Sequence, residues 1–340
     1  MDTKTQTDPY LIDTVPGSDF TDRSDLLDRF YPKDAIPIAR PVEIPHSARE
    51  EIFPGAVNSH GYRGDEFCAS GDFNIAYFGC SWVEGWGVPR GDIFTDRTTQ
   101  ILTKETGKKI TSYNFGLSAA GFDHTARLLP LALRHLTIDL VVIVVSGLER
   151  RELFAPSGRR RFFARRALER AKKKDFPITE PDLEAIRNLH ELSNDCADCA
   201  HFLSHFNLCA TLLDGRELPW VFTHIDWDPV IQQIQPLLAD GYLPASRFLG
   251  TPFEKIDRCN YDAAHPGLES HLKFAEQLSR SISDSELIEH VAVRRERREP
   301  SSATAQVKEP FFSRLGRLIG ASPKRETGHK KDKDNIYPQW

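Results

Sequence analysis

The feature that most constrains the fold is an unbroken apolar run, D-L-V-V-I-V-V, at residues 139–145. A strand with one solvent-exposed face alternates apolar and polar residues, whereas a strand without that alternation is buried on both faces. Further apolar strand-like segments lie on both sides of this run, and segments long enough to form helices separate them. The pattern therefore predicts a parallel sheet that is covered by helices on both faces.

The same reading assigns a type to each remaining segment of the central region. Strands are predicted at residues 74–78, 110–115, 139–145 and 220–225. Helices are predicted at residues 96–106, 124–135, 180–212, 231–238 and 265–282. This order of elements indicates a three-layer α/β/α sandwich with a mainly parallel, flavodoxin-like sheet.

The chain of 340 residues is long enough for one large domain or two small ones, and we interpret residues 46–290 as one α/β domain. Residues 1–45 lack sustained periodicity and are expected to form an extended N-terminal arm. Residues 291–340 are expected to form a flexible basic tail. Within the domain, residues 150–212 are expected to form a basic and helical insertion. Eleven Lys or Arg residues against two Glu at 150–174 mark its start.

Composition gives no sign of an unusual partner. Hydrophobic residues make up 40% of the chain, charged residues 27%, and the net charge is −5, as in ordinary globular proteins. A pI near 6.2 argues against a nucleic-acid partner. No secretory signal is recognisable at the N-terminus, and the longest strongly apolar stretch is too short for a transmembrane segment. We therefore expect a cytoplasmic protein with free thiols.

Three polar residues stand where a hydrolytic site would need them. Ser81 follows the predicted strand 74–78 in a turn rich in small residues, and Asp262 and His265 precede the last predicted helix. A serine hydroxyl needs a base to take its proton, and the base needs an orienting partner. The pattern thus indicates a serine hydrolase. The structural alternative is that Asp262 caps the helix and His265 is a surface residue.

The residues around these positions resemble the SGNH hydrolases, also called GDSL-type esterases and lipases. The nucleophile segment F-G-C-S-W-V-E-G-W-G-V has Cys80 where the family usually has Asp. The segment Y-N-F-G-L-S-A-A-G-F-D has Gly121 in the place of the oxyanion-hole glycine, and Y-D-A-A-H-P-G-L-E-S-H resembles the terminal Asp-x-x-His block. Upstream, N-S-H-G-Y-R-G-D-E is similar to a lead-in found in some bacterial members.

The resemblance covers about residues 55–283 and implies that Ser81 is the nucleophile, His265 the base and Asp262 its orienting acid. One block departs from the family, which usually carries Gly-x-Asn-Asp after the third strand. Here the segment reads V-V-S-G-L-E-R-R-E, without the asparagine that would donate to the oxyanion.

The expected oxyanion hole therefore consists of the backbone N–H groups of Ser81 and Gly121. Arg150 or the hydroxyl of Ser146 could replace the missing asparagine donor.

The implied function is hydrolysis of a small ester, plausibly an O-acylated carbohydrate, through a covalent acyl-enzyme. The substrate is a small-molecule or saccharide ester, and neither a cofactor nor a metal is expected. Two alternatives stay open: a binding or assembly protein that kept the fold without the activity, and an acyltransferase in surface-polysaccharide biosynthesis.

Three further signals are weaker. Cys196 and Cys199, with two nearby histidines and Cys209, have ligand-type spacing, but one helix rarely supplies a whole zinc site, so buried structural cysteines are favoured. The basic segment 150–174 is interpreted as a solvated helical insertion, with a lid for an anionic substrate as the alternative. The tail segment 311–320 and the terminal D-N-I-Y-P-Q-W could dock to a partner.

Overall fold

The computed structural model describes the central part of the chain. The described residues are 58, 60, 62–67, 71–154, 160–164, 188, 191, 193–259, 265–285 and 288. All of them belong to the compact unit Met1–Glu296, and the second unit, Arg297–Trp340, lies outside them. The predicted arm 1–45, the predicted tail 291–340 and Asp262 likewise lie outside the described residues.

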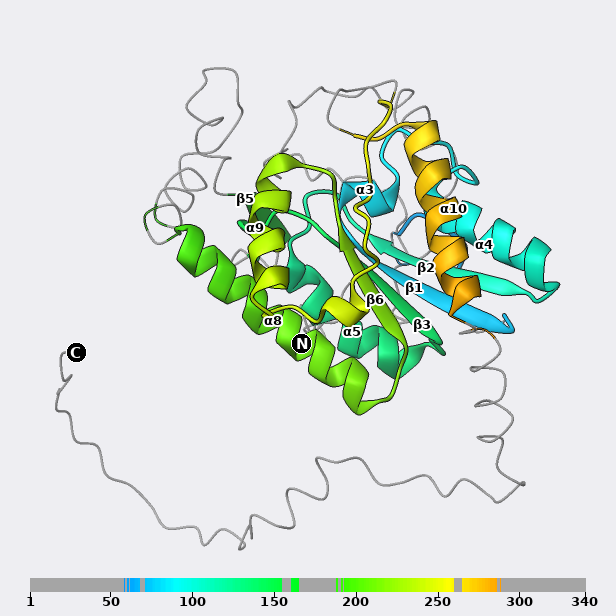
Figure 1. Cartoon of the computed structure of the whole chain (residues 1–340), viewed down its shortest axis with the longest axis horizontal. Helices are drawn as coiled ribbons and strands as arrows, with labels where there is room; N and C mark the ends of the chain where they lie inside the picture. Colours follow the sequence, from blue (N-terminus) through cyan, green and yellow to red (C-terminus); the bar gives the residue numbers. More distant parts are fainter. Residues whose placement is uncertain are drawn as a thin grey trace, which may run out of the picture. The chain divides into compact units, whose positions relative to one another are not determined.

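A parallel four-stranded sheet forms the centre of the described region (Figure 1). Its strands are β1 (Phe73–Gly79), β2 (Ile110–Gly116), β3 (Leu140–Val145) and β6 (Trp220–His224), in the order β2-β1-β3-β6. Isolated parallel bridges from Phe222 to Phe248 and from Ile225 to Phe253 continue this order beyond β6. The order is that of a flavodoxin-like winding, in which the chain reverses direction across the sheet beside the first strand. The predicted strands and the predicted winding are confirmed.

Helices follow the strands as predicted. They are α3 (Ser81–Glu84), α4 (Phe94–Thr106), α5 (Phe122–His135), α8 (Asp195–Gly215), α9 (Asp228–Ala239) and α10 (Leu268–Asp284), with a 3-10 turn η1 (Ala245–Arg247). No helix in the described part of the chain combines the length and the apolar character that a bilayer crossing requires.

Strand alternation assigns the helices to two layers. Neighbouring residues of a strand point to opposite faces of the sheet. On one face, the Tyr77 ring contacts Phe94 of α4 at 5.5 Å between centroids, and Phe94 contacts Phe274 of α10 at 4.9 Å. On the other face, Phe222 contacts Phe206 of α8 at 5.0 Å, and α8 packs against α5. The α4/α10 pair and the α5/α8 pair are therefore the outer layers of a three-layer α/β/α sandwich.

The predicted basic and helical insertion begins differently from the prediction. Residues 150–154 and 160–164 form an antiparallel pair, β4 (Arg150–Phe154) and β5 (Arg160–Ala164), rather than a helix. Their sequences, R-R-E-L-F and R-R-F-F-A, include aromatic residues with high strand propensity, which competed with the helical reading. The later part of the insertion is helical as predicted, since α8 covers residues 195–215.

Candidate active site

Ser81 lies at the carboxyl end of β1, where it is the first residue of the short helix α3 and is only 6% exposed. The turn that delivers it is tight. A Cβ added to Gly79 would lie 2.5 Å from Val83 Cγ2 and 2.9 Å from the Val144 carbonyl oxygen. Gly85, with φ of +79°, then ends α3 in the left-handed region that favours glycine. These packing limits explain the glycines at positions 79 and 85, before and after the serine.

A buried arginine from the lead-in segment holds the far side of this turn. Arg63 is 1% exposed, and its guanidinium donates to the carbonyl oxygens of Gly85 and of Val88, the latter at 2.9 Å. A longer contact of 3.4 Å reaches the carbonyl oxygen of Glu84. The carbonyls at the end of a helix lack partners within the helix. Arg63 supplies hydrogen-bond donors to these carbonyls. The lead-in segment N-S-H-G-Y-R-G-D-E, to which Arg63 belongs, thus holds the turn that carries Ser81.

His265 meets Ser81 across a separation of 184 positions in the sequence. Its Nε2 lies 2.9 Å from Ser81 Oγ, within hydrogen-bond distance of the proton that a base would remove. Trp86 stacks on the imidazole, with 5.3 Å between ring centroids and 25° between ring planes. The His265 carbonyl oxygen accepts from Cys259 N at 3.1 Å. The imidazole is thus oriented from one face, and its backbone is tied to the preceding loop.

Asp257 caps the helix that follows His265. Its carboxylate accepts from the backbone N–H groups of Gly267, Glu269 and Ser270 at 2.9–3.1 Å. Although partial burial opposes ionisation, these hydrogen bonds and the Ser270 hydroxyl lower the pKa of Asp257. Asp257 therefore caps the start of α10, and the capping role suggested for Asp262 lies outside the described residues.

The predicted oxyanion glycine, Gly121, is the N-cap residue of α5. A Cβ added there would lie 2.5 Å from the Arg150 carbonyl oxygen, so the loop after β3 packs directly on it. Ser146 Oγ donates to the Ala120 carbonyl oxygen at 3.0 Å. The Ser146 proton is therefore engaged with the backbone beside Gly121. Arg150 Nη1, in contrast, is buried and has no hydrogen-bond partner among the described residues.

Glu149 is a residue that sequence reasoning passed over. Counting from Gly147, it occupies the third position of Gly-x-x, where the resembled family has its asparagine. Its side chain is buried and folds back over Gly147, because a Cβ added to that glycine would contact both carboxylate oxygens. The residue count from Gly147 was the available signal. For Trp86 and Asp257 no comparable sequence signal existed.

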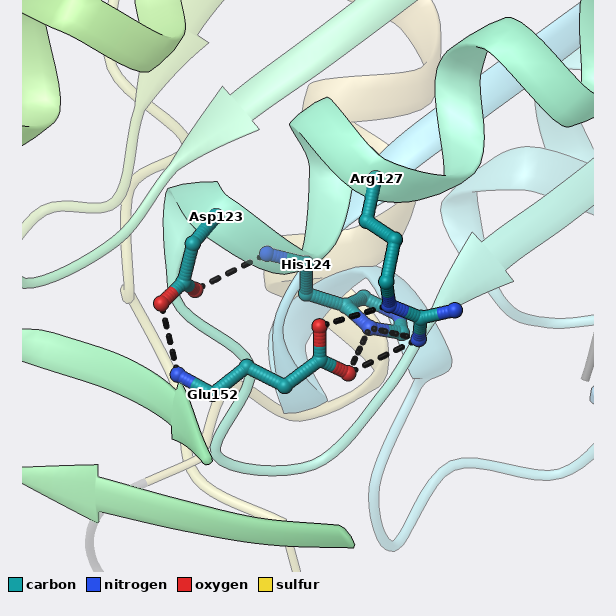
Figure 2. Close-up of polar contacts among 4 residues, drawn as sticks. All are labelled: Asp123, His124, Arg127 and Glu152. Carbon is teal, nitrogen blue, oxygen red and sulfur yellow. Dashed lines mark hydrogen bonds and ion pairs between the residues drawn. The ribbon is translucent and has the colours of Figure 1, made fainter. Parts of the chain in front are cut away.

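A charged cluster fixes the start of α5 to β4 (Figure 2). Arg127 binds Glu152 with two hydrogen bonds of 2.7 and 2.8 Å, and His124 Nδ1 lies 3.1 Å from the same carboxylate. Asp123 accepts from the backbone N of His124 at 2.8 Å and of Glu152 at 2.6 Å. Burial alone would raise the pKa of Glu152, but His124 and Arg127 outweigh it and hold that pKa well below its usual range.

A second ion pair fixes β4 to α8. Arg151 Nη2 lies 2.6 Å from the buried Asp198 carboxylate of α8. Together with the cluster at Asp123, this contact holds the strand whose first residue, Arg150, packs on Gly121. The base of the basic insertion is therefore part of the framework behind the expected oxyanion hole.

The cysteines among the described residues are free thiols of unequal exposure. Cys209 is buried, Cys199 is half-buried and Cys196 is exposed, so the prediction of buried cysteines holds for only part of the set. Burial raises the pKa of the Cys209 thiol to about 12. Across the described segments, His, Cys, Asp and Glu side chains form no group of three suited to a metal ion.

Comparisons with known proteins give distant likenesses only. No protein-family model matches the chain, and no curated protein matches it. A G-D-S-L family protein from Desulfitobacterium hafniense DCB-2 is 12% identical, with a TM-score of 0.38, over 61% of this chain and 98% of its own. An acetyl xylan esterase from Butyrivibrio proteoclasticus is 11% identical, with a TM-score of 0.37, over 64% of this chain and 65% of its own. A lipolytic G-D-S-L family member from Veillonella parvula DSM 2008 is 12% identical, with a TM-score of 0.33, over 66% of this chain and 99% of its own. At these TM-scores the likeness carries no argument, so the fold rests on the strand order and the site on its geometry.

Proposed function

We propose that this protein is a serine esterase that acts through Ser81 and His265, with Asp262 as the acid that orients the histidine. The observation that carries the proposal is the 2.9 Å separation between Ser81 Oγ and His265 Nε2. A nucleophilic serine is weak on its own and gains reactivity when an adjacent imidazole accepts its proton. The position of Ser81 at the carboxyl edge of a parallel sheet also supports the proposal, since ligands of such sheets bind there.

The proposed reaction is acyl transfer in two steps. Ser81 Oγ attacks the ester carbonyl carbon as its proton moves to His265 Nε2, and a tetrahedral oxyanion forms. The intermediate collapses, the C–O bond to the alcohol breaks, and His265 returns the proton to the leaving alcohol. Water then attacks the acyl-enzyme with His265 again accepting the proton, which releases the carboxylic acid and restores Ser81.

Stabilisation of the oxyanion is assigned to backbone N–H groups. Ser81 is the first residue of α3 and Gly121 is the N-cap of α5, so neither N–H has an acceptor within its own helix. Donors that are already oriented stabilise the charge that develops in the transition state. Arg150, whose buried Nη1 has no hydrogen-bond partner within the described segments, is the side chain best suited to replace the asparagine donor. Ser146 is less suited because its proton is donated to Ala120.

Labelling with a fluorophosphonate serine probe tests the proposal. We expect the wild-type protein to be labelled, and the Ser81→Ala and His265→Ala variants to remain unlabelled. Active protein would then be screened on small esters, with O-acetylated sugars first. Acyl transfer that rises with an added sugar acceptor would identify a transferase. Absence of labelling in folded wild-type protein would contradict the proposal.

One observation favours a second candidate, a binding protein that kept the fold without catalysis. Glu149 occupies the position of the family's asparagine and has no amide N–H that could donate to an oxyanion. Under this alternative the protein would bind an acylated saccharide without cleaving it. Binding measured by calorimetry, without product release over hours, would support this second candidate.

A further inference from the structure

A buried carboxyl group lies on the turn that carries Ser81. Glu84 is the last residue of α3, three positions after Ser81, and residues three apart on a helix share one side of it. Its side chain is inaccessible to solvent. Oε2 accepts a hydrogen bond from Ser118 Oγ, whereas Oε1 is buried and has no hydrogen-bond partner among the described residues. Burying a carboxyl group with an unsatisfied oxygen is unfavourable. The contact of Glu84 that offsets part of this cost is its hydrogen bond with Ser118.

Ser118 belongs to loop 117–121, which connects β2 to α5 and ends at Gly121. The backbone holds the start of this loop, because Leu117 N donates to the Gly79 carbonyl oxygen at 3.1 Å. Its middle residue, Ala119, has a φ of +66°, a conformation that is unfavourable for a residue with a Cβ. A strained loop of this kind persists only where surrounding contacts determine its shape. The bond between Ser118 and Glu84 is such a contact, and it joins the loop to the turn that carries Ser81.

The other side of the same turn is fixed independently. Arg63 binds the backbone carbonyls that follow Glu84, and Gly116 packs so closely on the Glu84 backbone nitrogen that a Cβ would clash. Burial raises the pKa of Glu84 to about 7, although the Ser118 hydrogen bond and the nearby Arg63 charge oppose the shift. Glu84 therefore sits in a rigid frame, and its carboxyl group reaches loop 117–121, whose end is also held by the hydrogen bond from Ser146 Oγ to the Ala120 carbonyl oxygen.

We propose that Glu84 and Ser118 form a positioning pair that sets the place of the Gly121 N–H relative to Ser81 Oγ. The inference rests on the proposed function, since the position of Gly121 matters for rate only if Ser81 is the nucleophile. The pair is assigned no contact with reacting atoms and acts through the geometry of loop 117–121. Loss of a whole oxyanion donor costs about 10²–10³ in rate. Partial misplacement of one donor should cost less, about tenfold.

The test compares three variants of the whole chain. Ser118→Ala removes the bridge, Ser118→Thr keeps a hydroxyl, and Ser285→Ala removes a part-buried hydroxyl at the far end of α10, where it bonds Ile282 O at 2.8 Å. In Ser118→Ala we expect kcat for ester hydrolysis and the fluorophosphonate labelling rate to fall about tenfold, with KM within twofold of wild type. Ser118→Thr should recover most of the loss, and Ser285→Ala should show none. Wild-type kcat in Ser118→Ala overturns the inference.

Hydrogen exchange separates failure of the inference from failure of the proposed function. Exchange of the backbone amides in residues 117–123 is measured in the same three variants, because this readout needs no activity. Faster exchange in Ser118→Ala, and not in Ser285→Ala, supports the positioning role of the Glu84–Ser118 pair. Absence of labelling in the wild-type protein would contradict only the proposed function and would leave this exchange result standing. Wild-type exchange rates in Ser118→Ala overturn the positioning role whatever the activity.

Discussion

The turn after β1 and the loop after β3 both end at the carboxyl edge of the sheet, but their polar groups are used very differently. Residues 79–88 are held by close packing of Gly79 on the Val144 carbonyl oxygen and of Gly85 on the Ile93 side chain, and by the buried guanidinium of Arg63. Residues 146–150 hold a buried glutamate and an arginine whose Nη1 has no partner in the described region. The first segment also follows the resembled family closely, whereas the second departs from it.

The difference teaches where a site of this kind can change. Substitutions at Gly79 or Gly85 would disturb close packing, because an added Cβ would lie 2.5 Å from Val83 Cγ2 at Gly79 and 2.7 Å from the Ile93 side chain at Gly85. In the loop after β3, Ser146 and the Arg150 carbonyl support Gly121, while the side chains of Glu149 and Arg150 are not committed to that support. Substitutions in the two segments should therefore have different effects on stability and on rate.

Replacing either member of the proposed reacting pair should abolish activity. We expect Ser81→Ala and His265→Ala each to lower kcat for ester hydrolysis by about 10⁴-fold or more, the scale of loss found when the serine or histidine of a catalytic triad is replaced. The double variant should be no worse than the single ones, because the two groups act as a unit. The exposed His135→Ala variant serves as the control and should keep wild-type kcat. Loss in Ser81→Ala alone would remove His265 from the mechanism.

Arg63→Met should destabilise the turn after β1 more than any substitution of equal size on the surface. The variant leaves the carbonyls of Gly85 and Val88 without their charged donor in a buried place. We expect the free energy of unfolding to fall by about 3 kcal/mol or more, measured by urea denaturation. Arg134→Met, at an exposed position of α5, should change it by less than about 0.5 kcal/mol. Equal effects of the two substitutions would mean that Arg63 does not hold the turn.

The buried carboxyl group in the turn predicts a pH dependence of stability. The pKa of Glu84 is about 7 in the folded protein, above its ordinary value of 4.5, so between these two pH values the folded state binds more protons than the unfolded state. Stability therefore falls as pH rises through this window. The loss should be on the order of 3 kcal/mol relative to Glu84→Gln, which cannot titrate. Urea denaturation of both proteins at pH 4 and pH 8 measures it, and parallel pH curves would contradict it.

The smallest expected effect concerns the loop after β3. Glu149→Asn restores the asparagine of the resembled family and adds a donor, so we expect kcat to rise about tenfold, less than a fully placed donor would give. Glu149→Asp keeps the negative charge and should show no rise. Steady-state kinetics on one activated ester compares the three proteins. A fall in kcat in Glu149→Asn would show that the glutamate itself has a place in the reaction.

The sheet could be predicted from the sequence because a strand that is buried on both faces is a continuous run of apolar residues. The run at residues 139–145 and its neighbours predicted the parallel strands, and glycine punctuation predicted the turn at Ser81. The meeting of Ser81 with His265 was expected from the order of the motifs rather than from any local pattern.

Other features depend on tertiary contacts that no local pattern records. Arg150 to Phe154 pairs with β5, and contacts of Glu152 with α5 and of Arg151 with α8 add to the strand propensity of the aromatic residues in this pair. Trp86 and Asp257 are ordinary residues in the sequence. They gain roles only because the fold brings them beside His265 and α10.

The long separation between Ser81 and His265 also has a consequence for synthesis of the protein. The serine follows the first strand of the sheet, whereas the histidine precedes α10, which packs on α4. A growing chain on the ribosome therefore holds its serine long before it holds the proposed base, and the pair cannot form until the segment before α10 has emerged and docked. Covalent labelling of Ser81 would for this reason count only finished molecules, which makes the proposed site a reporter of complete folding.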